Sequence, residues 1–405
     1  MIPADFLLNV AVIGADSPIG LTVVRELGMH GLNVLVLSRK PTSLARFSRW
    51  ARTFGLLRGS LAESLPALLT RHRIGAVLAI SESDLVQLAE LKTSLPEHNL
   101  LVPDSDKLAI VLDKAQTLEI AARIGIDVPA SWQPQAGEDF AEKAQELAFP
   151  VAVKWADPGT VLPLLEAHRL AFEKVEYADD APSLLRILAR YDALGRWPLV
   201  QYRCPGYGFG QMLNMHRGKA TLRFQHERLR EYPPSGGVSS FCQSLPVTDH
   251  AAQFELSERL LQEIGWEGPA MVEYRHDPQT GKYWLMEVNG RFWGSLPLAH
   301  HCGVHFAWES YRCQMLDQEA APQVRYPGRR ARFLIPDAKH ALAVMTTPEW
   351  SIRRRLGTLA SFVAGFFDPR VRYYVGSLRD PRPLLVDLWL GLTKFRRRET
   401  TGRGA

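Results

Sequence analysis

The chain has 405 residues, of which 46% are hydrophobic and 22% are charged. This length and balance suit two or three domains with their own cores, and they exclude a disordered or fibrous protein. Four scattered cysteines exclude a disulfide framework, and no apolar run reaches the roughly 20 residues of a membrane-spanning helix. Because the first residues also lack the pattern of a signal peptide, we expect a protein of the reducing cytoplasm.

The charge is distributed unevenly along the chain. Residues 325–405 contain 17 Lys and Arg against 6 Asp and Glu, a net charge of +11, whereas residues 1–324 contain 31 against 37, a net charge of −6. A nucleic-acid enzyme is expected to carry positive charge around its site. The acidic main body therefore argues against nucleic acid as a partner.

The N-terminal third alternates short apolar runs with amphipathic helices. Residues 7–13 predict a buried strand, followed by a glycine turn at 14–20, a helix that ends near Leu27 and a second strand at 33–37. This order indicates a parallel sheet. The alternation continues with a helix at 61–71, a strand at 76–80, a helix after 81–84 and a strand at 100–102. We therefore expect a doubly wound, Rossmann-like α/β domain over residues 1–107.

The middle of the chain, residues 108–324, is predicted to be α+β. Longer helices alternate there with strands that carry polar residues at regular intervals, at 151–154, 199–202, 220–225, 270–274 and 283–288. This pattern is typical of antiparallel sheets with one face turned toward a ligand. We divide the region into subdomains at 108–198 and 199–324. Residues 325–405 predict a basic helical extension with apolar stretches at 356–367 and 384–392.

Two strand-like runs with acidic residues stand close together, at 271–274 and 285–291, with a turn between them. As a hairpin they would hold Glu273, Glu287 and Asn289 on one face, since strand side chains alternate. Hard oxygen ligands that converge on one point suit Mg²⁺ bound to nucleotide phosphates. The alternative is the solvent-facing edge of an ordinary hairpin.

Two lysines could contact phosphate groups. Lys154 ends the apolar run at 149–153, so its ammonium group can project from a strand end, and Lys114 opens a helix after Leu112-Asp113. Each of them taken alone is equally a solvated surface lysine.

Six segments follow one another in a characteristic order: Asp113-Lys114, 125–129, 149–154, 199–206, 271–273 and 286–295. Together they resemble the ATP-grasp superfamily, particularly its branch similar to the carbamoyl-phosphate synthase large subunit. The resemblance covers about residues 1–310, and the paired acidic strands with their Asn-x-Arg ending are its most specific part.

The resemblance implies a nucleotide gripped between two α+β subdomains, behind a pre-ATP-grasp domain at 1–107. It implies that ATP binds with Mg²⁺, or with Mn²⁺ in its place. The γ-phosphoryl group would pass to a small-molecule carboxylate, and an amine or other nucleophile would attack the acyl phosphate. The product would be a carbon-nitrogen bond, with substrates whose identity the sequence does not specify.

The resemblance also implies roles for individual residues. Lys114 and Lys154 would contact phosphates, and Arg291 would stabilise the transferring phosphoryl group or the acyl phosphate. Glu273, Glu287 and Asn289 would hold one or two metal ions. The adenine would be bordered by backbone groups of four consecutive residues, Gln201, Tyr202, Arg203 and Cys204.

Two features depart from the family pattern. The family commonly has an acidic residue where Tyr202 stands, and it has a glycine-rich loop after the strand lysine, where this chain has only Trp-Ala-Asp-Pro-Gly-Thr at 155–160. A degenerate ATP-binding protein without catalytic activity is therefore one alternative.

Residues 226–240 resemble the loop that approaches the acceptor substrate in such ligases. Polar and cationic side chains stand there ahead of a Ser-Gly-Gly turn, which predicts a mobile anion-binding flap. Arg228, as a catalytic residue, and Arg230 would recognise the carboxylate. The alternative is a plain hairpin loop.

An NAD(P)-dependent short-chain reductase is a further alternative, because the turn at 14–20 and Ser38-Arg39-Lys40 would suit a dinucleotide with a 2′-phosphate. That class normally uses a Tyr-x-x-x-Lys pair, a spacing that the chain does not contain. We therefore interpret this domain as the substrate side of a ligase, with residues 81–84 as an acceptor contact.

Two further segments, at 300–305 and 384–398, each have a simple structural explanation. The cluster His300-His301-Cys302-Gly303-Val304-His305 follows an apolar helix-like run and lacks a second ligand pair, so we interpret it as helix-end packing rather than a zinc site. The tail at 384–398 would suit a helix on the anionic inner face of a membrane, and a helix docked on the protein with a solvated basic end explains it equally well.

Overall fold

The structure is a computed structural model that describes residues 6–155, 158–173, 175–234, 236–319, 323, 325–348 and 350–401; the side chains at 158–159 and 392–401 lie outside the description. The chain forms two compact units. Unit 1 comprises Met1–Ile120, Tyr207–Glu273 and Val288–Ala405, and unit 2 comprises Ala121–Gly206 and Tyr274–Glu287. The predicted domain limits at 107, 198 and 324 remain predictions.

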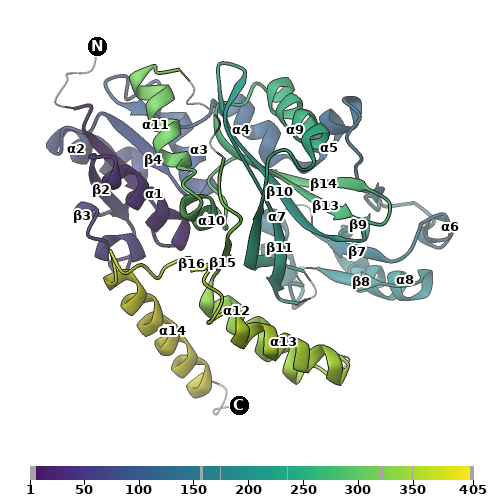
Figure 1. Ribbon diagram of the computed structural model, residues 1–405. Coiled ribbons are helices and arrows are strands. Elements are labelled where there is room, and N and C mark those ends of the chain that lie inside the picture. Colours follow the sequence, from purple (N-terminus) through teal and green to yellow (C-terminus); the bar gives the residue numbers. More distant parts are fainter. Residues whose placement is uncertain are drawn as a thin grey trace. The chain divides into compact units, whose positions relative to one another are not determined.

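A five-stranded parallel sheet forms the N-terminal part of unit 1 (Figure 1). Its strand order is β3-β2-β1-β4-β5, and helices connect successive strands, which confirms the predicted α/β character. The elements are β1 Asn9–Ile13, α1 Pro18–Met29, β2 Asn33–Ser38, η1 Leu44–Phe47, β3 Ala51–Leu56, α2 Leu61–Arg71, β4 Ala76–Ala79, α3 Glu82–Leu91, β5 Asn99–Leu100 and α4 Ser105–Leu112.

Strand β3 is the one element of this sheet that we did not predict. Its six residues are half-buried or exposed, whereas β4 is buried throughout. Central strands of a parallel sheet are covered on both faces and therefore read as apolar runs. An edge strand does not have to show that signal.

A seven-stranded sheet completes unit 1, in the order β14-β13-β10-β11-β12-β15-β16. The tip of the β13 and β14 hairpin, at Tyr274–Glu287, belongs to unit 2. The predicted strands at 220–225, 270–274 and 283–288 lie within β11, β13 and β14. The elements are β10 Tyr207–His216, β11 Lys219–Tyr232, β12 Val238–Leu245, α9 Ala251–Ile264, β13 Gly268–Asp277, β14 Lys282–Asn289, α10 Leu296–His301 and α11 Phe306–Leu316.

The C-terminal residues are helical in part, and they also add two strands to this sheet. Short strand β15 pairs with β12, and β16 pairs with β15. The elements are β15 Arg330–Arg332, α12 Leu334–Thr346, α13 Ile352–Ala364, β16 Val371–Tyr373 and α14 Arg382–Thr401. The C-terminal residues are therefore not the purely helical extension that we predicted. Arg332 of β15 is fully buried, and Asp337 balances its charge at 2.6 Å.

Unit 2 is built on a four-stranded sheet in the order β6-β9-β7-β8. Strands β7 and β9, predicted at 151–154 and 199–202, pair in antiparallel fashion and contribute to an apolar core with α6 and α8. Helix α5 begins in unit 1 and ends in unit 2. The elements are α5 Lys114–Arg123, β6 Ser131–Trp132, α6 Phe140–Gln145, β7 Val151–Lys154, α7 Pro158–Ala167, β8 Glu176–Ala178, α8 Ala181–Ala189, η2 Asp192–Leu194 and β9 Leu199–Tyr202.

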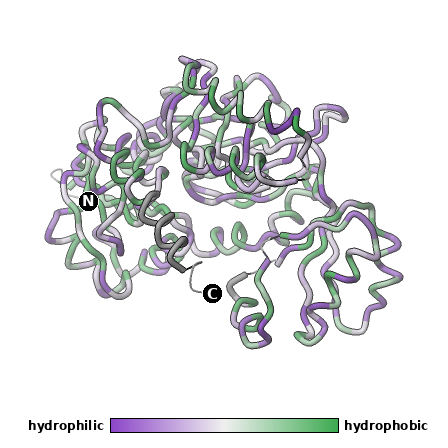
Figure 2. The backbone as a smooth tube through the Cα atoms, turned by 90° about the horizontal axis from the view of Figure 1, so that it is seen from below, coloured by the Kyte–Doolittle hydropathy of each residue, from purple (hydrophilic) through white to green (hydrophobic). Residues whose placement is uncertain are grey.

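None of the helices in the described part of the chain has the length and hydropathy needed to cross a membrane. In Figure 2, hydrophilic positions, in purple, are interspersed with hydrophobic positions, in green.

Candidate active site

Two predicted site residues of unit 1, Arg228 and Glu273, form an ion pair. Arg228 on β11 places Nη2 2.5 Å from Oε2 of Glu273 on β13, and Nη1 3.0 Å from Oε1 of Glu231. The three side chains are 12%, 16% and 17% exposed. Burial opposes the charge of Arg228, but the two carboxylates outweigh it and raise the pKa of the guanidinium above its ordinary value.

A glycine on β10 leaves the space that the Arg228 side chain needs to reach Glu273. Strand β10 lies between β11 and β13 in the sheet, so the Arg228 side chain has to cross it to reach Glu273. At the crossing stands Gly208, where an added Cβ would lie 2.6 Å from Arg228 Cδ and 2.9 Å from Glu231 Oε1. A larger residue at 208 would displace the guanidinium. Sequence reasoning missed both Gly208 and Glu231, because only the strand order brings them to Arg228.

Arg291, which follows β14, reaches the N-terminal sheet of unit 1. Its Nε donates to Oε1 of Glu82 at 2.9 Å. Glu82 begins α3, directly after β4, and Ser81 caps this helix by accepting from the backbone N–H of Asp84. Arg291 thus lies at the carboxyl edge of the sheet, beside the segment 81–84 that we expected to contact the acceptor.

The strand end that carries Asn289 is fixed by close packing. Asn289 is 9% exposed. A Cβ on the next residue, Gly290, would lie 2.4 Å from Cη2 of the buried Trp266. Glycine is therefore required between Asn289 and Arg291, because a larger residue would clash with Trp266.

The predicted metal ligands are a carboxylate and an amide in unit 1, Glu273 and Asn289, and a carboxylate in unit 2, Glu287. Among the residues that the structure describes, no three His, Cys, Asp or Glu side chains group as a metal site. The predicted set has only two carboxylates. Its oxygen donors fit a hard cation such as Mg²⁺, and one of them, Glu273, is also the partner of Arg228.

In unit 2 the structure brings together Lys154 and Gln201. Lys154 at the end of β7 donates to Oε1 of Gln201 at 2.7 Å, and Gln201 Nε2 donates to Ser131 Oγ at 2.9 Å. Gln201 is 3% exposed, so its amide is a fixed anchor for the ammonium group. The lysine is therefore oriented by its neighbours on the sheet.

The rest of the predicted adenine segment is tied into the same sheet. The N–H groups of Tyr202 and Arg203 donate to the carbonyls of Ala130 and Pro150. The Arg203 guanidinium lies over the ring of Tyr177, 4.3 Å from its centroid. Burial raises the pKa of the Cys204 thiol to about 11, which keeps it protonated near neutral pH.

Lys114 is the first residue of α5 and belongs to unit 1. Asp113 before it caps the helix by accepting from the N–H groups of Ala115 and Gln116. The predicted helix start is confirmed. The phosphate contact of Lys114 stays a prediction. Of residues 155–160, which stand where the family has its glycine-rich loop, residues 156 and 157 lie outside the described part of the chain.

The segment predicted as a flap is a β-hairpin. Residues 226–232 belong to β11 and β12 begins at Val238, while Ser235 between them lies outside the described residues. Arg230 pairs with the buried Asp337 through two contacts, of 2.6 and 2.9 Å. The hairpin agrees with the alternative prediction of a hairpin loop, and Arg230 contacts α12 through Asp337. Whether Arg230 also recognises a carboxylate stays a prediction.

Sequence reasoning also missed His226, which is fully buried on β11. Its Nδ1 lies 3.3 Å from Oγ of Ser295, six residues after Asn289. Burial, with the charge of Arg228, lowers the pKa of His226 to about 3, so the imidazole is neutral. No sequence signal marked this residue, since a single histidine in a strand is ordinary.

The dinucleotide-like turn is filled by the chain's own polar groups. Arg39 Nη1 donates to Oδ1 of Asp84 at 2.7 Å, and Ser38 Oγ donates to Oδ1 of Asp16 at 2.6 Å. A Cβ on Gly14 would meet Asp84 Oδ2 at 2.8 Å. Arg39 and Lys40, the cations that would have to meet the 2′-phosphate in a reductase, are thus paired with Asp84 and Asp16.

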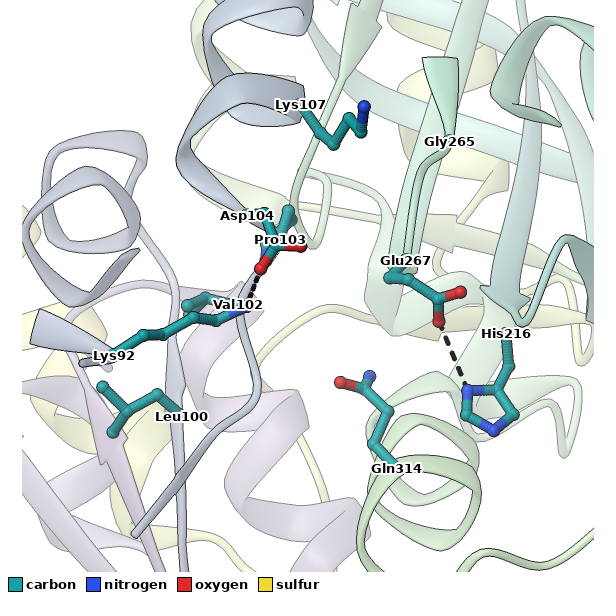
Figure 3. Close-up of a pocket in the computed structure, with 10 residues that line it drawn as sticks. All are labelled: Lys92, Leu100, Val102, Pro103, Asp104, Lys107, His216, Gly265, Glu267 and Gln314. Atoms are coloured by element: carbon teal, nitrogen blue, oxygen red, sulfur yellow. Dashed lines mark hydrogen bonds and ion pairs between the residues drawn. The ribbon is translucent and has the colours of Figure 1, made fainter. Parts of the chain in front are cut away.

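A polar pocket of about 250 Å³ lies elsewhere in unit 1 (Figure 3). It contains none of the predicted site residues. Within its lining, Lys92 pairs with Asp104 at 2.7 Å and His216 lies 3.3 Å from Glu267, while Lys107 pairs with Asp106 at 3.0 Å. The pocket is thus separate from the candidate active site.

Comparison with curated proteins gives partial matches. D-alanine--D-alanine ligase of Burkholderia pseudomallei (strain 668) is 34% identical over 86 residues, which span 21% of this chain and 26% of that protein. Acetyl-CoA carboxylase 2 of Oryza sativa subsp. japonica is 24% identical over 159 residues, 38% of this chain and 6% of that protein. The matches therefore span much less than two thirds of either relative. No family model matches the chain.

Solved structures match most of the chain. N5-carboxyaminoimidazole synthetase from Staphylococcus aureus, complexed with ADP, has a TM-score of 0.60 at 13% identity and covers 80% of this chain and 81% of its own. Biotin carboxylase from Campylobacter jejuni gives 0.59 at 14% identity, with 77% and 72% covered. L-amino acid ligase from Bacillus licheniformis gives 0.56 at 15% identity, with 76% and 73% covered. These neighbours are ATP-grasp ligases, and the chain has the ATP-grasp fold.

Proposed function

We propose that the protein is an ATP- and Mg²⁺-dependent ligase that activates a small carboxylate as an acyl phosphate and joins it to an amine. The observation that carries the proposal is the Arg228 and Glu273 ion pair on the sheet of an ATP-grasp fold, with Asn289 at the end of β14 and Arg291 just after it. The curated and structural relatives, ligases and carboxylases, support it.

Lys154 is the proposed phosphate ligand of unit 2. The buried Gln201 amide orients its ammonium group, so less side-chain entropy is lost when a phosphate binds. Lys114 is a second proposed phosphate ligand, and the backbone at Gln201, Tyr202, Arg203 and Cys204 would border the adenine. The Staphylococcus aureus synthetase is complexed with ADP and the Campylobacter jejuni biotin carboxylase with β-γ-ATP, which supports ATP as the cosubstrate here.

Glu273, Glu287 and Asn289 are the proposed ligands of Mg²⁺, or of Mn²⁺ in its place. When bound, such an ion would neutralise phosphate charge and polarise the phosphoryl oxygens. Without it, Arg228 faces the charges of Glu273 and Glu231, so this group of three carries a net negative charge that opposes an anionic substrate. We therefore expect binding of the triphosphate to depend on the divalent cation.

Arg228 and Arg291 are the proposed anion-binding residues of the reaction. Carboxylates hold both guanidiniums in position, which suits stabilisation of developing charge. Arg291 lies at the carboxyl edge of the parallel sheet, the edge at which α/β domains commonly bind ligands. We assign the acceptor carboxylate to this edge.

The test is calorimetric titration with a non-hydrolysable ATP analogue, with and without Mg²⁺. We expect Mg²⁺-dependent binding that weakens at least about tenfold in Glu287→Ala. Glu263→Ala, which removes an exposed carboxylate of α9, should leave it unchanged. Binding indifferent to both Mg²⁺ and Glu287 would contradict the metal assignment.

Two further measurements separate the alternatives. Release of ADP with pairs of carboxylates and amines distinguishes a ligase from a non-catalytic ATP-binding protein, which would bind the analogue but show no turnover with any pair. Binding of NADPH with no binding of the triphosphate would overturn the ligase proposal in favour of the reductase. The carboxylates of Asp16 and Asp84 lead us to expect no NADPH binding.

We also propose a peripheral contact between an anionic membrane and residues 384–398. In the described part of this segment, Leu385, Leu388 and Trp389 are 66%, 39% and 56% exposed at helical spacing. The side chains at 392–398 lie outside the described residues. Deletion of 384–405 should reduce retention of the protein on anionic vesicles at low salt, and unchanged retention would contradict the contact.

A further inference from the structure

Helix α13 exposes a continuous apolar stripe. None of its residues is buried, and four of its apolar side chains are largely exposed: Ile352 by 74%, Leu356 by 58%, Leu359 by 41% and Val363 by 46%. Their spacing of four, three and four residues places them along one face of the helix. Phe367, exposed by 82%, continues the stripe just beyond the helix end.

Residues outside the stripe hold α13 on the protein, so the orientation of the stripe is fixed. The guanidinium of Arg332 lies 4.5 Å from the ring centroids of both Phe362 and Phe366. Arg230 donates to the hydroxyl of Ser361 at 2.8 Å. These contacts anchor the polar and aromatic side of the helix on unit 1 and direct the aliphatic stripe away from it.

Positive charge borders the stripe. By helical geometry Arg353 and Arg355 fall on its two sides. Residues 350–391 contain seven arginines against three aspartates. An apolar face bordered by arginines is the composition of helices that lie in the interface of an anionic bilayer.

We propose that α13 docks this protein on an anionic lipid surface, with the stripe from Ile352 to Phe367 inserted among the headgroups. This contact is additional to the one at 384–398 and does not depend on the ligase reaction. Charge favours this occupant over a second copy of the chain, because two α13 faces would bring like-charged arginines together. In Figure 1, α13 and α14 both lie in the lower part of the view, and each carries exposed apolar residues.

An environment-sensitive fluorophore at position 367 tests the proposal. The four native cysteines are all buried, so Phe367→Cys supplies an accessible thiol. Its emission should shift to the blue with vesicles that contain roughly one third phosphatidylglycerol, and high salt should reverse the shift. A label at Leu8→Cys, a position exposed by 54% in the N-terminal domain, is the control and should not shift.

Polar substitutions within the stripe provide a second test of vesicle binding. Leu356→Gln combined with Leu359→Gln keeps residues that favour a helix and should weaken vesicle binding at least about tenfold. Leu8→Gln should bind as the unmodified chain does. Arg353→Gln should weaken binding to anionic vesicles several-fold, about the contribution of one basic residue, with Arg58→Gln as its control.

Three results would overturn the proposal. The first is full vesicle binding by the double variant, and the second is a label at 367 that stays exposed to water on bound vesicles. The third is a blue shift without vesicles that grows with protein concentration, which would assign the stripe to a second copy. Nucleotide binding measured on the same variants should stay unchanged, so failure here is distinguishable from failure of the ligase proposal.

Discussion

At the scale of residues, the candidate site depends on one charge held between two others. Arg228 lies between Glu273 and Glu231, and the three side chains are all less than a fifth exposed. Burying such charges costs desolvation energy that their attraction offsets only with good geometry. The two carboxylates therefore fix the position of the Arg228 guanidinium more than they stabilise the fold. Gly208 allows this arrangement, because it leaves room for the Arg228 side chain.

Replacing Gly208 should affect activity more than stability. In Gly208→Val the new side chain would push Arg228 from its place over β10, because even a Cβ lies 2.6 Å from Arg228 Cδ. We expect the free energy of unfolding to fall by about 1–3 kcal/mol. Turnover, or Mg²⁺-dependent nucleotide binding, should fall at least about tenfold, since misplacement of a positioned group by about 1 Å is costly.

Gly328→Val is the matched control, because no atom lies within 4 Å of a Cβ built at this glycine. Its unfolding and its turnover should resemble those of the unmodified chain. If Gly208→Val keeps full turnover, the position of Arg228 does not matter to the reaction. Chemical denaturation and ADP release measured on the same preparations decide the point.

At the scale of elements, a buried network joins the C-terminal segment to the large sheet. Asp337, on α12, is fully buried and pairs with Arg230 of β11 at 2.6 Å and with Arg332 of β15 at 2.6 Å. Arg332 also packs against the rings of Phe362 and Phe366. One carboxylate thereby fixes two strands and two helices to each other.

Asp337→Asn should destabilise the protein strongly. The substitution leaves two buried guanidiniums without their counter-charge, and loss of one partner from a buried ion pair costs about 3–5 kcal/mol. Arg370→Gln breaks the exposed pair with Asp368, in which Arg370 is 63% exposed, and should cost far less. Urea unfolding of the two variants compares them, and equal losses would contradict the structural role of Asp337.

This network also shows why β15 and β16 could not be predicted. Strands β4, β7 and β9 are marked by short apolar runs of their own, and the sequence predicted them nearly residue for residue. Strand β15 has the sequence Arg-Ala-Arg, and its burial depends on Asp337 and Phe362, which follow later in the chain. The hydrophobic pattern of a three-residue segment does not reveal partners that lie elsewhere in the chain.

At the scale of the whole molecule, chain order and spatial grouping differ. The resemblance predicted the fold, because the paired acidic strands and the Asn-x-Arg ending are specific to it. It did not predict that segments around 1–120, 207–273 and 288–405 form one unit. The Arg228 and Glu273 pair and the Arg291 contact with Glu82 arise from that grouping, 45 and 209 residues apart in the chain. Residue types were thus predictable, whereas their partners were not.

Buried ionisable groups of unit 1 tie the stability of the fold to pH. Burial lowers the pKa of His300 to about 4 and of His301 to about 3, as it does for His226. Burial raises the pKa of Glu26 to about 7, against the opposing effects of His305 and two backbone N–H groups. Glu26 Oε1 faces His300 at 3.4 Å, and His30, His305 and Arg25 lie around the same histidine.

Stability should therefore rise with pH between about pH 4 and 6.5. In this window the unfolded chain binds protons at histidines that the folded chain keeps neutral, and each such proton contributes a slope of about 1.4 kcal/mol per pH unit. Glu26 acts in the opposite direction, because its protonated form is favoured in the fold and its contribution is lost as pH rises through about 7. The effect of three histidines exceeds that of one carboxyl, so the net slope of stability against pH is positive.

His301→Gln should make this slope smaller, whereas His168→Gln, at an exposed position, should not. Denaturation midpoints across this pH range measure the slope, and a stability that falls toward pH 6.5 in the unmodified chain would show that Glu26, rather than the histidines, dominates.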